Sequence, residues 1–163
     1  MKLQTSKRKR IALLVESSLG SGRSILRGIS QFARQVGNWE LLYAPRGLED
    51  VVPDWLESWE GDGVIARIQD EGMLSALKKL EIPVVDVLGV PDHDLPLVRV
   101  DDEKISGKIA KHFLDRSFDH FSFYGIEGES WSRRREDAFR QAIASGKSYA
   151  SLNSLRGISE CNS

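Results

Sequence analysis

Residues 11–29, IALLVESSLGSGRSILRGI, join three patterns that decide the fold class. The apolar run 11–15 has the length and composition of a buried β-strand. The loop after it is rich in serine and glycine, and apolar residues recur at helical spacing from position 25 onward. A buried strand that delivers a polar loop to the start of a helix predicts an open α/β sheet, in which ligands bind at this edge.

The glycines of this loop match neither of the two common phosphate-binding templates. A P-loop requires G-x-x-x-x-G-K-[ST], but with Gly22 as its second glycine, Ser17 stands at the first and Arg23 replaces the lysine. The dinucleotide pattern G-x-G-x-x-G fits Gly20 and Gly22, but its third position is Ile25. The sequence therefore disfavours a nucleotide site and predicts only a polar loop that faces a ligand.

The rest of the chain alternates short apolar runs with helical periodicity. This pattern predicts strands at 11–15, 39–43, 64–66, 83–88, 97–100 and 121–124, and helices at 23–36, 52–59, 71–80 and 131–143. A further helix is capped by Asp101 or Asp102 and runs to about Arg116. Gly37 and Asn38 end the first helix, since both tolerate a left-handed backbone. Strands and helices in alternation imply parallel strands with helices on both faces.

Composition limits the class of protein. The 163 residues carry a formal net charge of −1, with 40% hydrophobic and 29% charged residues, as in an ordinary globular domain. No apolar run reaches the ~20 residues that cross a bilayer, and the charged start is not a secretory signal. The single cysteine, Cys161, excludes an intramolecular disulfide and a cysteine-rich zinc site. We expect a cytoplasmic protein with no membrane partner. Residues 7–10, KRKR, are interpreted as a solvated tail, with nucleic-acid contact as the alternative.

Four later segments, in order, resemble a known family. They are GDGVIARI at 61–68, IPVVDVLG at 82–89, VRVDDEKISGKIAKHFLDRSFDHFSFYG at 98–125 and WSRRREDAFRQAI at 131–143. Together they are similar to the LacI/GalR-type sugar domain, which is periplasmic-binding-protein-like. With KRIALLVESS at 9–18, the last two segments resemble more narrowly the N-terminal half of the xylose operon regulators (XylR). Those regulators join such a sugar domain to an AraC-type DNA-binding domain.

The resemblance covers about residues 8–144 and implies two Rossmann-like lobes with sugar between them. It implies a basic tail at 1–7, a first lobe at 8–117 and the start of a second lobe at 118–144. Residues 145–163, rich in Ser, Gly and Asn, resemble nothing in the family and are predicted to be disordered. The expected fold is thus a three-layer Rossmann-like α/β lobe with a parallel sheet, followed by an incomplete second lobe, as in a truncated regulator.

Two serines in the first loop are candidate ligand residues. By resemblance, Ser17, Ser18 and the stretch 20–23 lie in the first-strand loop that faces the sugar. Serine hydroxyls donate and accept hydrogen bonds, which suits a sugar better than a polyanion. The alternative is a plain connecting loop in which Ser24 caps the helix.

Arg67 is a candidate because it ends the third strand, where open sheets meet their ligands. It could instead form a surface ion pair with Asp70 or Glu71. Asp86 lies inside an apolar strand and needs a partner if it is buried. The three histidines show no metal-ligand spacing, and no paired carboxylates or Ser-His-Asp arrangement stands out. We therefore expect no catalytic residue, no cofactor and no metal.

Three further candidates follow from the resemblance. Arg135 matches the Arg of the family's R-x-x-G-F element, which grips sugar hydroxyls; the alternative is a surface charge. Trp131 lies one helical turn earlier and can share a face with Arg135, either as a plate for the sugar ring or as a hydrophobic staple. Asp101 matches the Asp of V-x-x-D-N and could accept hydrogen bonds from two hydroxyls, or serve as a helix N-cap.

The chain departs from the family pattern beside these residues. Asp102 replaces the Asn of V-x-x-D-N, Ala138 replaces the Gly of R-x-x-G-F, and Ser117 stands at the lobe crossing where the family usually has Gly.

The resemblance implies a monosaccharide sensor, for a pentose such as xylose, in a regulator that reaches DNA only through a missing helix-turn-helix domain. A homodimer is a possible assembly. The alternatives are a solute-binding protein for transport and a small α/β enzyme acting on a phosphorylated ligand. With an incomplete second lobe, we expect weak or no sugar binding. We also expect self-association or poor solubility through exposed apolar groups, among them Phe121, Phe123 and Phe139.

Overall fold

The computed structural model describes residues 7–45, 47, 52–90, 92–127, 130–146 and 151–157. The chain divides into two compact units, unit 1 within Met1–Arg99 and unit 2 within Val100–Ser163. The division lies before the helix that follows Asp101, whereas the resemblance implies a lobe boundary after residue 117. That helix packs on the later helix of unit 2, and this contact explains why it belongs there.

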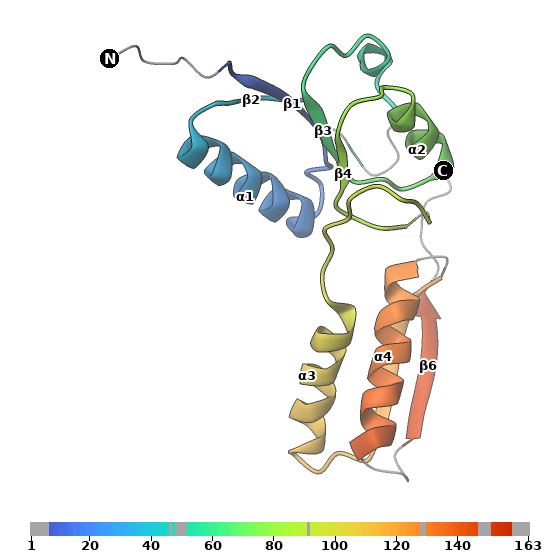
Figure 1. The fold of residues 1–163 in the computed structure, drawn as a ribbon. Helices are drawn as coiled ribbons and strands as arrows, with labels where there is room; N and C mark the ends of the chain where they lie inside the picture. Colours follow the sequence, from blue (N-terminus) through green and yellow to red (C-terminus); the bar gives the residue numbers. More distant parts are fainter. Residues whose placement is uncertain are drawn as a thin grey trace. The chain divides into compact units, whose positions relative to one another are not determined.

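Unit 1 is built on a parallel four-stranded sheet (Figure 1). Its strands are β1 (Lys9–Leu14), β2 (Trp39–Tyr43), β3 (Gly63–Ala66) and β4 (Val84–Asp86), in the order β2-β1-β3-β4. The chain moves outward from β1 to β2 and then returns past β1 to β3. β1 and β3 therefore flank a topological switch point, where open sheets form ligand crevices at the carboxyl ends of their strands.

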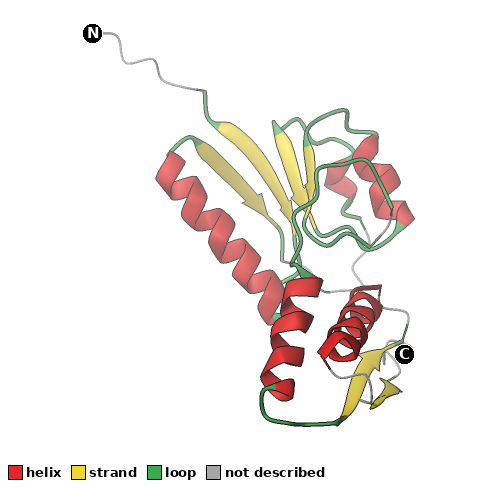
Figure 2. Ribbon diagram, turned by 60° about the horizontal axis from the view of Figure 1, so that its bottom comes forward, coloured by secondary structure: helices red, strands yellow, loops and turns green. Residues whose placement is uncertain are grey.

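Helices cover both faces of this sheet, as the alternating pattern predicts (Figure 2). α1 (Gly20–Val36) connects β1 to β2, and α2 (Glu71–Lys78) connects β3 to β4. These two connections run in opposite directions along the sheet, and such crossovers are right-handed, so the helices lie on opposite faces. The expected three-layer α/β arrangement is confirmed. Gly37 ends α1 with a φ of 72°, also as expected.

The main core of unit 1 lies between the sheet and α2. Its buried members are Ala12, Leu14, Leu56, Val64, Ala66, Ile68, Met73, Leu74, Leu77 and Val84. Each large side chain buried here contributes roughly 1.5–3 kcal/mol. The face of α1 is less well covered. Gly22 and Ala33 are its buried residues, while Phe32 and Val36 remain exposed.

Two predicted elements of unit 1 are much shorter than expected. The helix predicted at 52–59 is a single 3₁₀ turn, η1 (Asp54–Leu56), because one turn after Pro53 already places Leu56 in the core. The strand predicted at 97–100 is reduced to one bridge between Asp86 and Leu97. Val98 and Val100 are exposed, so no burial of their side chains favours a longer strand.

Unit 2 is a β–α–β unit preceded by a helix. It consists of α3 (Asp102–Leu114), β5 (His120–Ile126), α4 (Ser130–Gly146) and β6 (Ser151–Gly157). α3 and α4 lie side by side, and α4 also packs on β5 (Figure 1). Phe121 of β5 meets Phe139 of α4 edge to face, with ring centroids 5.8 Å apart. This aromatic contact lies at the centre of the unit 2 core.

β6 corrects the expectation that residues 145–163 are disordered. It runs parallel to β5 along its whole length, from His120 opposite Ser151 to Ile126 opposite Gly157. Leu152 packs against the core of unit 2, but Ser151, Asn153, Ser154 and Gly157 give the segment the composition of a loop. Residues 147–150 and 158–163 lie outside the described residues.

Ser117 adopts a left-handed conformation, with a φ of 62°. The Ser117 N–H donates to the Leu114 carbonyl at 2.9 Å, and the Phe118 N–H donates to the Phe113 carbonyl at 3.3 Å. The rings of Phe113 and Phe118 also pack edge to face. Together these contacts form a Schellman motif, which ends α3 and favours glycine at this position. This left-handed conformation explains why the family usually has glycine at the lobe crossing.

Candidate functional site

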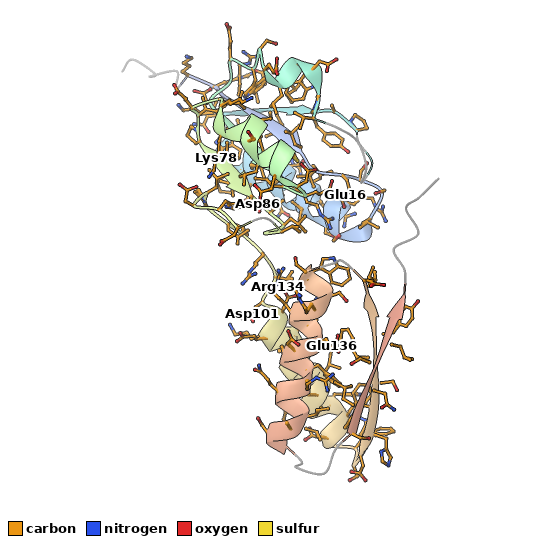
Figure 3. All side chains as sticks on the ribbon, turned by 90° about the vertical axis from the view of Figure 1, so that its right-hand side faces the viewer. Glu16, Lys78, Asp86, Asp101, Arg134 and Glu136 are labelled. Carbon is orange, nitrogen blue, oxygen red and sulfur yellow. The ribbon has the colours of Figure 1, made fainter. Side chains whose placement is uncertain are left out.

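The carboxyl edge of the unit 1 sheet carries a buried ion pair between the ends of β1 and β3. Glu16 comes two residues after β1, and Arg67 comes directly after β3. Arg67 Nη1 donates to Glu16 Oε1 at 2.7 Å. The Glu16 side chain is 2% exposed and the Arg67 side chain 14%. Figure 3 labels Glu16 at this edge of the sheet.

Two polar atoms of this pair have no hydrogen-bond partner among the described residues. They are Glu16 Oε2 and Arg67 Nε, and both are buried. A buried polar atom left unpaired costs about 1–3 kcal/mol, and more when it is charged. Such atoms need an explanation, and a ligand or water at this place would provide one. The edge therefore offers a carboxylate acceptor and a guanidinium donor side by side.

Hydrogen bonds from the Arg23 side chain hold the loop between β1 and α1 in place. Arg23 Nη1 donates to the carbonyl oxygens of Ser17 and Ser18 at 2.8 Å and 2.6 Å. Gly22, in the first turn of α1, packs directly on Glu16. A Cβ at position 22 would lie 2.0 Å from the Glu16 carbonyl oxygen and 2.5 Å from Oε1. Gly22 is therefore needed for close packing.

The sequence-predicted residues Ser17, Ser18 and Arg67 lie at the ends of neighbouring strands on this edge. Arg67 pairs with Glu16, and not with Asp70 or Glu71. Ser24 is not the helix cap: Leu19 holds that position, and Ser24 Oγ donates to the Gly20 carbonyl within α1.

Glu16 is the residue that sequence reasoning missed. A signal for it exists, because a charged residue directly follows the apolar strand 11–15 and Arg67 directly follows β3. Opposite charges at the ends of neighbouring strands would have indicated the pair. The pair could be predicted only with the knowledge that β1 and β3 are adjacent strands, which the order of the sheet shows.

Asp86 is fully buried and has the partners that its burial requires. Its Oδ1 accepts the N–H groups of Ile68 and Leu88, and its Oδ2 accepts that of Gly89. Oδ2 also lies 3.0 Å from Nε2 of His93, whose side chain is buried. The carboxylate thus joins the end of β4 to the loops around it, which is a structural role.

In unit 2, one buried carboxylate holds two arginines of α4. Asp102 Oδ2 accepts from Arg134 Nε at 3.1 Å, and Oδ1 accepts from Arg135 Nε at 2.8 Å. The Asp102 side chain is 6% exposed, whereas those of Arg134 and Arg135 are 29% and 34% exposed. Figure 3 labels Arg134 on α4. The carboxylate fixes each guanidinium through Nε.

Trp131 shares a face of α4 with Arg135, as their one-turn spacing predicts. The Arg135 Cζ lies 4.9 Å from the centroid of the Trp131 ring, a cation–π contact. Arg135 is therefore held from two sides, by the Asp102 carboxylate and by the indole ring. Arg134 is part of the same cluster.

Asp101 is the N-cap of α3. Its Oδ1 accepts the Lys104 N–H at 2.8 Å, and its Oδ2 lies 3.0 Å from Lys104 Nζ. The hydrogen bond to Asp101 and the attraction of its charge raise the pKa of Lys104. Of the two roles open for Asp101, the structure has the cap, and the ligand role stays a prediction.

A second buried carboxylate ties β6 to α4. Glu136 Oε1 accepts from Arg140 Nη2 at 3.2 Å and from the Ser154 hydroxyl. Arg140 Nη2 also donates to Ser154 Oγ at 2.9 Å. This polar contact fixes β6 where its apolar content is low.

The basic cluster near the N-terminus is partly used by the fold. β1 begins at Lys9, whose Nζ lies 3.2 Å from Asp62 Oδ1, and the Arg10 N–H donates to Asp62 Oδ2 at 2.8 Å. These contacts, the Arg10 N–H first and Lys9 second, lower the pKa of Asp62. Arg10 also lies over the Trp59 ring. Two of the four basic residues at 7–10 therefore have structural partners.

Within the described ranges, no three or more His, Cys, Asp or Glu side chains form a group that could hold a metal ion. In the same residues, no helix is both long and apolar enough to cross a membrane.

Comparison with known proteins identifies the family. A family model described as the XylR N-terminal domain matches residues 10–98. This chain belongs to the XylR N-terminal domain family. The xylose operon regulatory protein of Escherichia coli (strain K12) is 29% identical over 153 residues, which cover 87% of this chain and 38% of that protein. The chain thus spans well under half the length of the curated relatives that it matches.

Solved structures agree on the fold. The structure of the xylose-binding transcription activator XylR matches with a TM-score of 0.71 at 23% identity, over 94% of this chain and 39% of that one. Cra from Pseudomonas putida, a transcriptional dual regulator in complex with fructose 1-phosphate, matches with a TM-score of 0.65 at 20% identity, over 94% of this chain and 60% of that one.

Proposed function

We propose that this chain senses a neutral monosaccharide, a xylose-like pentose, as the effector-binding part of a transcription regulator of sugar catabolism. The observation that carries the proposal is the cluster of hydrogen-bonding groups at the switch point of unit 1, in a chain of the XylR N-terminal domain family. Sugar hydroxyls both donate and accept, so they match an edge that offers both kinds of group.

We propose candidate sugar-binding residues for each unit separately. In unit 1 they are Ser17 and Ser18, on a loop that Arg23 already holds in place, and Arg67, directly after β3. In unit 2, Arg135 has its Nε on Asp102, so its terminal nitrogens can serve adjacent hydroxyls. Trp131 offers an aromatic face to the C–H groups of a sugar ring. For Asp101, a ligand role requires that sugar hydroxyls replace Lys104 at Oδ2.

The wider role follows the family. A regulator of this kind acts in the cytoplasm, contacts DNA through a separate helix-turn-helix domain and works as a homodimer. Sugar shifts its conformational equilibrium by binding one state better than the other. The two solved structures reported above are of transcription regulators. One is named as xylose-binding, and the other was crystallised with a phosphorylated hexose. Fold alone therefore does not choose between neutral and phosphorylated sugars, and the side chains of the site must.

A panel of sugars tests the proposal on the 163-residue chain. Xylose, arabinose, ribose and glucose are titrated at millimolar concentrations while the thermal unfolding midpoint is followed. We expect weak, saturable stabilisation by a pentose, because only part of the relatives' length is present. The double variant Ser17→Ala/Ser18→Ala should lose the response, and so should Arg135→Ala.

Two matched controls belong to the panel. Ser24→Ala changes a serine that bonds within its own helix, and Arg133→Ala changes an exposed arginine on the same helix as Arg135. Both should keep the response to sugar. If no sugar stabilises the wild-type chain, or if all variants respond equally, the proposed function is wrong.

A further inference from the structure

The N-terminus of α1 has the features of an anion site, with one exception. Helix N-termini attract anions because their first N–H groups are unpaired and the helix dipole is positive there. α1 begins at the carboxyl edge of the sheet, has no side-chain cap, and has no acidic residue in its first turn. The cation Arg67 lies at the same edge. This combination would suit a phosphate group.

The exception is that the chain places its own carboxylate there. A Cβ at Gly22, in the first turn of α1, would lie 2.5 Å from Glu16 Oε1 and 2.8 Å from Glu16 Cδ. The carboxyl group therefore sits directly on the first turn. Because the Glu16 side chain is only 2% exposed, water does little to screen its charge.

The same carboxylate also neutralises the nearby cation. Arg67 Nη1 is bonded to Glu16 Oε1, so the two charges cancel. Glu16 Oε2 is buried and has no partner among the described residues. An uncharged hydroxyl could donate to Oε2. A deprotonated phosphate oxygen could not, and it would also meet a like charge in a poorly screened place.

We propose that Glu16 is the residue that sets charge selectivity at this site: it fills the anion position of α1 with an internal carboxylate, admits neutral hydroxyl-bearing sugars and excludes phosphorylated ones. This inference rests on the proposed function, since it specifies the class of sugar that the site accepts. Glu16 does so through one oxygen that holds Arg67 and a second that remains for the ligand. Gly22 is required because no other residue lets the carboxylate reach the helix.

The test replaces the charge and keeps the shape. Glu16→Gln removes the negative charge and leaves Arg67 and the start of α1 without a counter-ion. The thermal unfolding midpoint is measured in sodium phosphate and in sodium chloride at equal ionic strength, and then with xylose. The control variant Glu40→Gln changes the net charge equally at an exposed position of β2. The double variant Glu16→Gln/Arg67→Gln removes both charges.

The proposal predicts that phosphate stabilises Glu16→Gln over chloride, with an upward shift of the midpoint that grows with phosphate concentration. Wild type, Glu40→Gln and the double variant should show no such shift. If phosphate shifts the wild type as much as Glu16→Gln, or shifts neither, the charge-selectivity proposal is wrong. If Glu16→Gln fails to fold, the wild type still decides it: phosphate-induced changes in the amide NMR signals of residues 21–23 would overturn the proposal, and their absence beside xylose-induced changes would support it.

The xylose and phosphate measurements distinguish the charge-selectivity proposal from the proposed function on which it rests. A xylose response of the wild type together with a phosphate response of the wild type contradicts only the charge selectivity. If neither xylose nor another neutral sugar affects any variant, the proposed function fails, and the charge-selectivity proposal fails with it.

Discussion

Each unit has a buried carboxylate that pairs with arginine, but the number and the exposure of the arginines differ. In unit 1, Glu16 meets one arginine that is itself almost buried. In unit 2, Asp102 meets two arginines that are each about a third exposed. The first arrangement ends with a carboxylate oxygen that has no partner among the described residues. The second fixes both arginines through Nε, and Arg134 Nη1 also donates to Ser130 Oγ.

The difference shows how the same ion pair can serve two purposes. A one-to-one buried pair is rigid, neutral and sensitive to the loss of either partner, since the remaining charge is then buried alone. When two partly exposed arginines share a carboxylate, water solvates their guanidinium groups in part, so the ion pairs contribute less to stability. Their main effect is to position the guanidinium groups. Substitutions should separate these roles by the size of their effects.

The largest effect is expected from Arg67→Met. It keeps much of the apolar stem but leaves the buried Glu16 carboxylate without a cation, which should lower the free energy of unfolding by roughly 3–5 kcal/mol. Amide hydrogen exchange in β1 and β3 measures this locally. The double variant Glu16→Gln/Arg67→Met should recover most of the loss, because no charge remains buried. An equally unstable double variant would show that shape, and not charge, decides the stability of this edge.

Gly22→Ala should be the next most harmful change. Its Cβ would lie 2.0 Å from the Glu16 carbonyl oxygen, and such overpacking costs about 1–3 kcal/mol. Gly28→Ala is the matched control on the same helix, where a Cβ meets no atom within 4 Å. It should stabilise α1 by about 0.5–1 kcal/mol through helix propensity. Urea denaturation of the two variants should therefore give opposite signs, and equal signs would contradict the close contact of Gly22 with Glu16.

Asp102→Asn should have a smaller effect than Arg67→Met. The amide keeps the shape of the side chain, but only its oxygen can accept, so one hydrogen bond is lost and the other is weakened. Water can solvate both arginines in part. We expect a loss of about 1–2 kcal/mol, measured by hydrogen exchange in α3 and α4. An effect as large as that of Arg67→Met would remove the distinction between the two units.

The smallest effect, and a favourable one, is expected from Ser117→Gly. Relief of the left-handed backbone should raise the stability of unit 2 by roughly 0.5–1 kcal/mol. Ser122→Gly, on an exposed position of β5, should lower it, because glycine weakens a strand. The thermal midpoints of the two variants in circular dichroism give the comparison. If Ser117→Gly is not the more stable, the Schellman motif at the end of α3 is in doubt.

The sheet of unit 1 was predictable because its strands are apolar runs and its helices carry a clear period. β6 was not, because SLNSLRG has the composition of a loop and is fixed by pairing to β5 and by the contact of Ser154 with Glu136. The placement of α3 in unit 2 was not predictable for a related reason. Helical periodicity shows that α3 has an inner face, but not that this face packs on α4.

For the candidate site, the sequence could place Ser17, Ser18 and Arg67 at strand ends, since parallel strands end at one edge. It could also place Trp131 and Arg135 on one helical face. It could not show that Glu16 reaches both Arg67 and Gly22, because that contact depends on the order of the strands. Nor could it show that Asp102, a departure from the family pattern, holds two arginines.

The most direct test of the central claim is an NMR titration of the ¹⁵N-labelled chain with xylose. The proposed sugar site at the edge of unit 1 predicts saturable shifts of the amide signals of residues 16–23 and of Arg67 and Ile68, at concentrations where phosphate causes none. The absence of saturable shifts in this group, or equal shifts caused by phosphate, would contradict it.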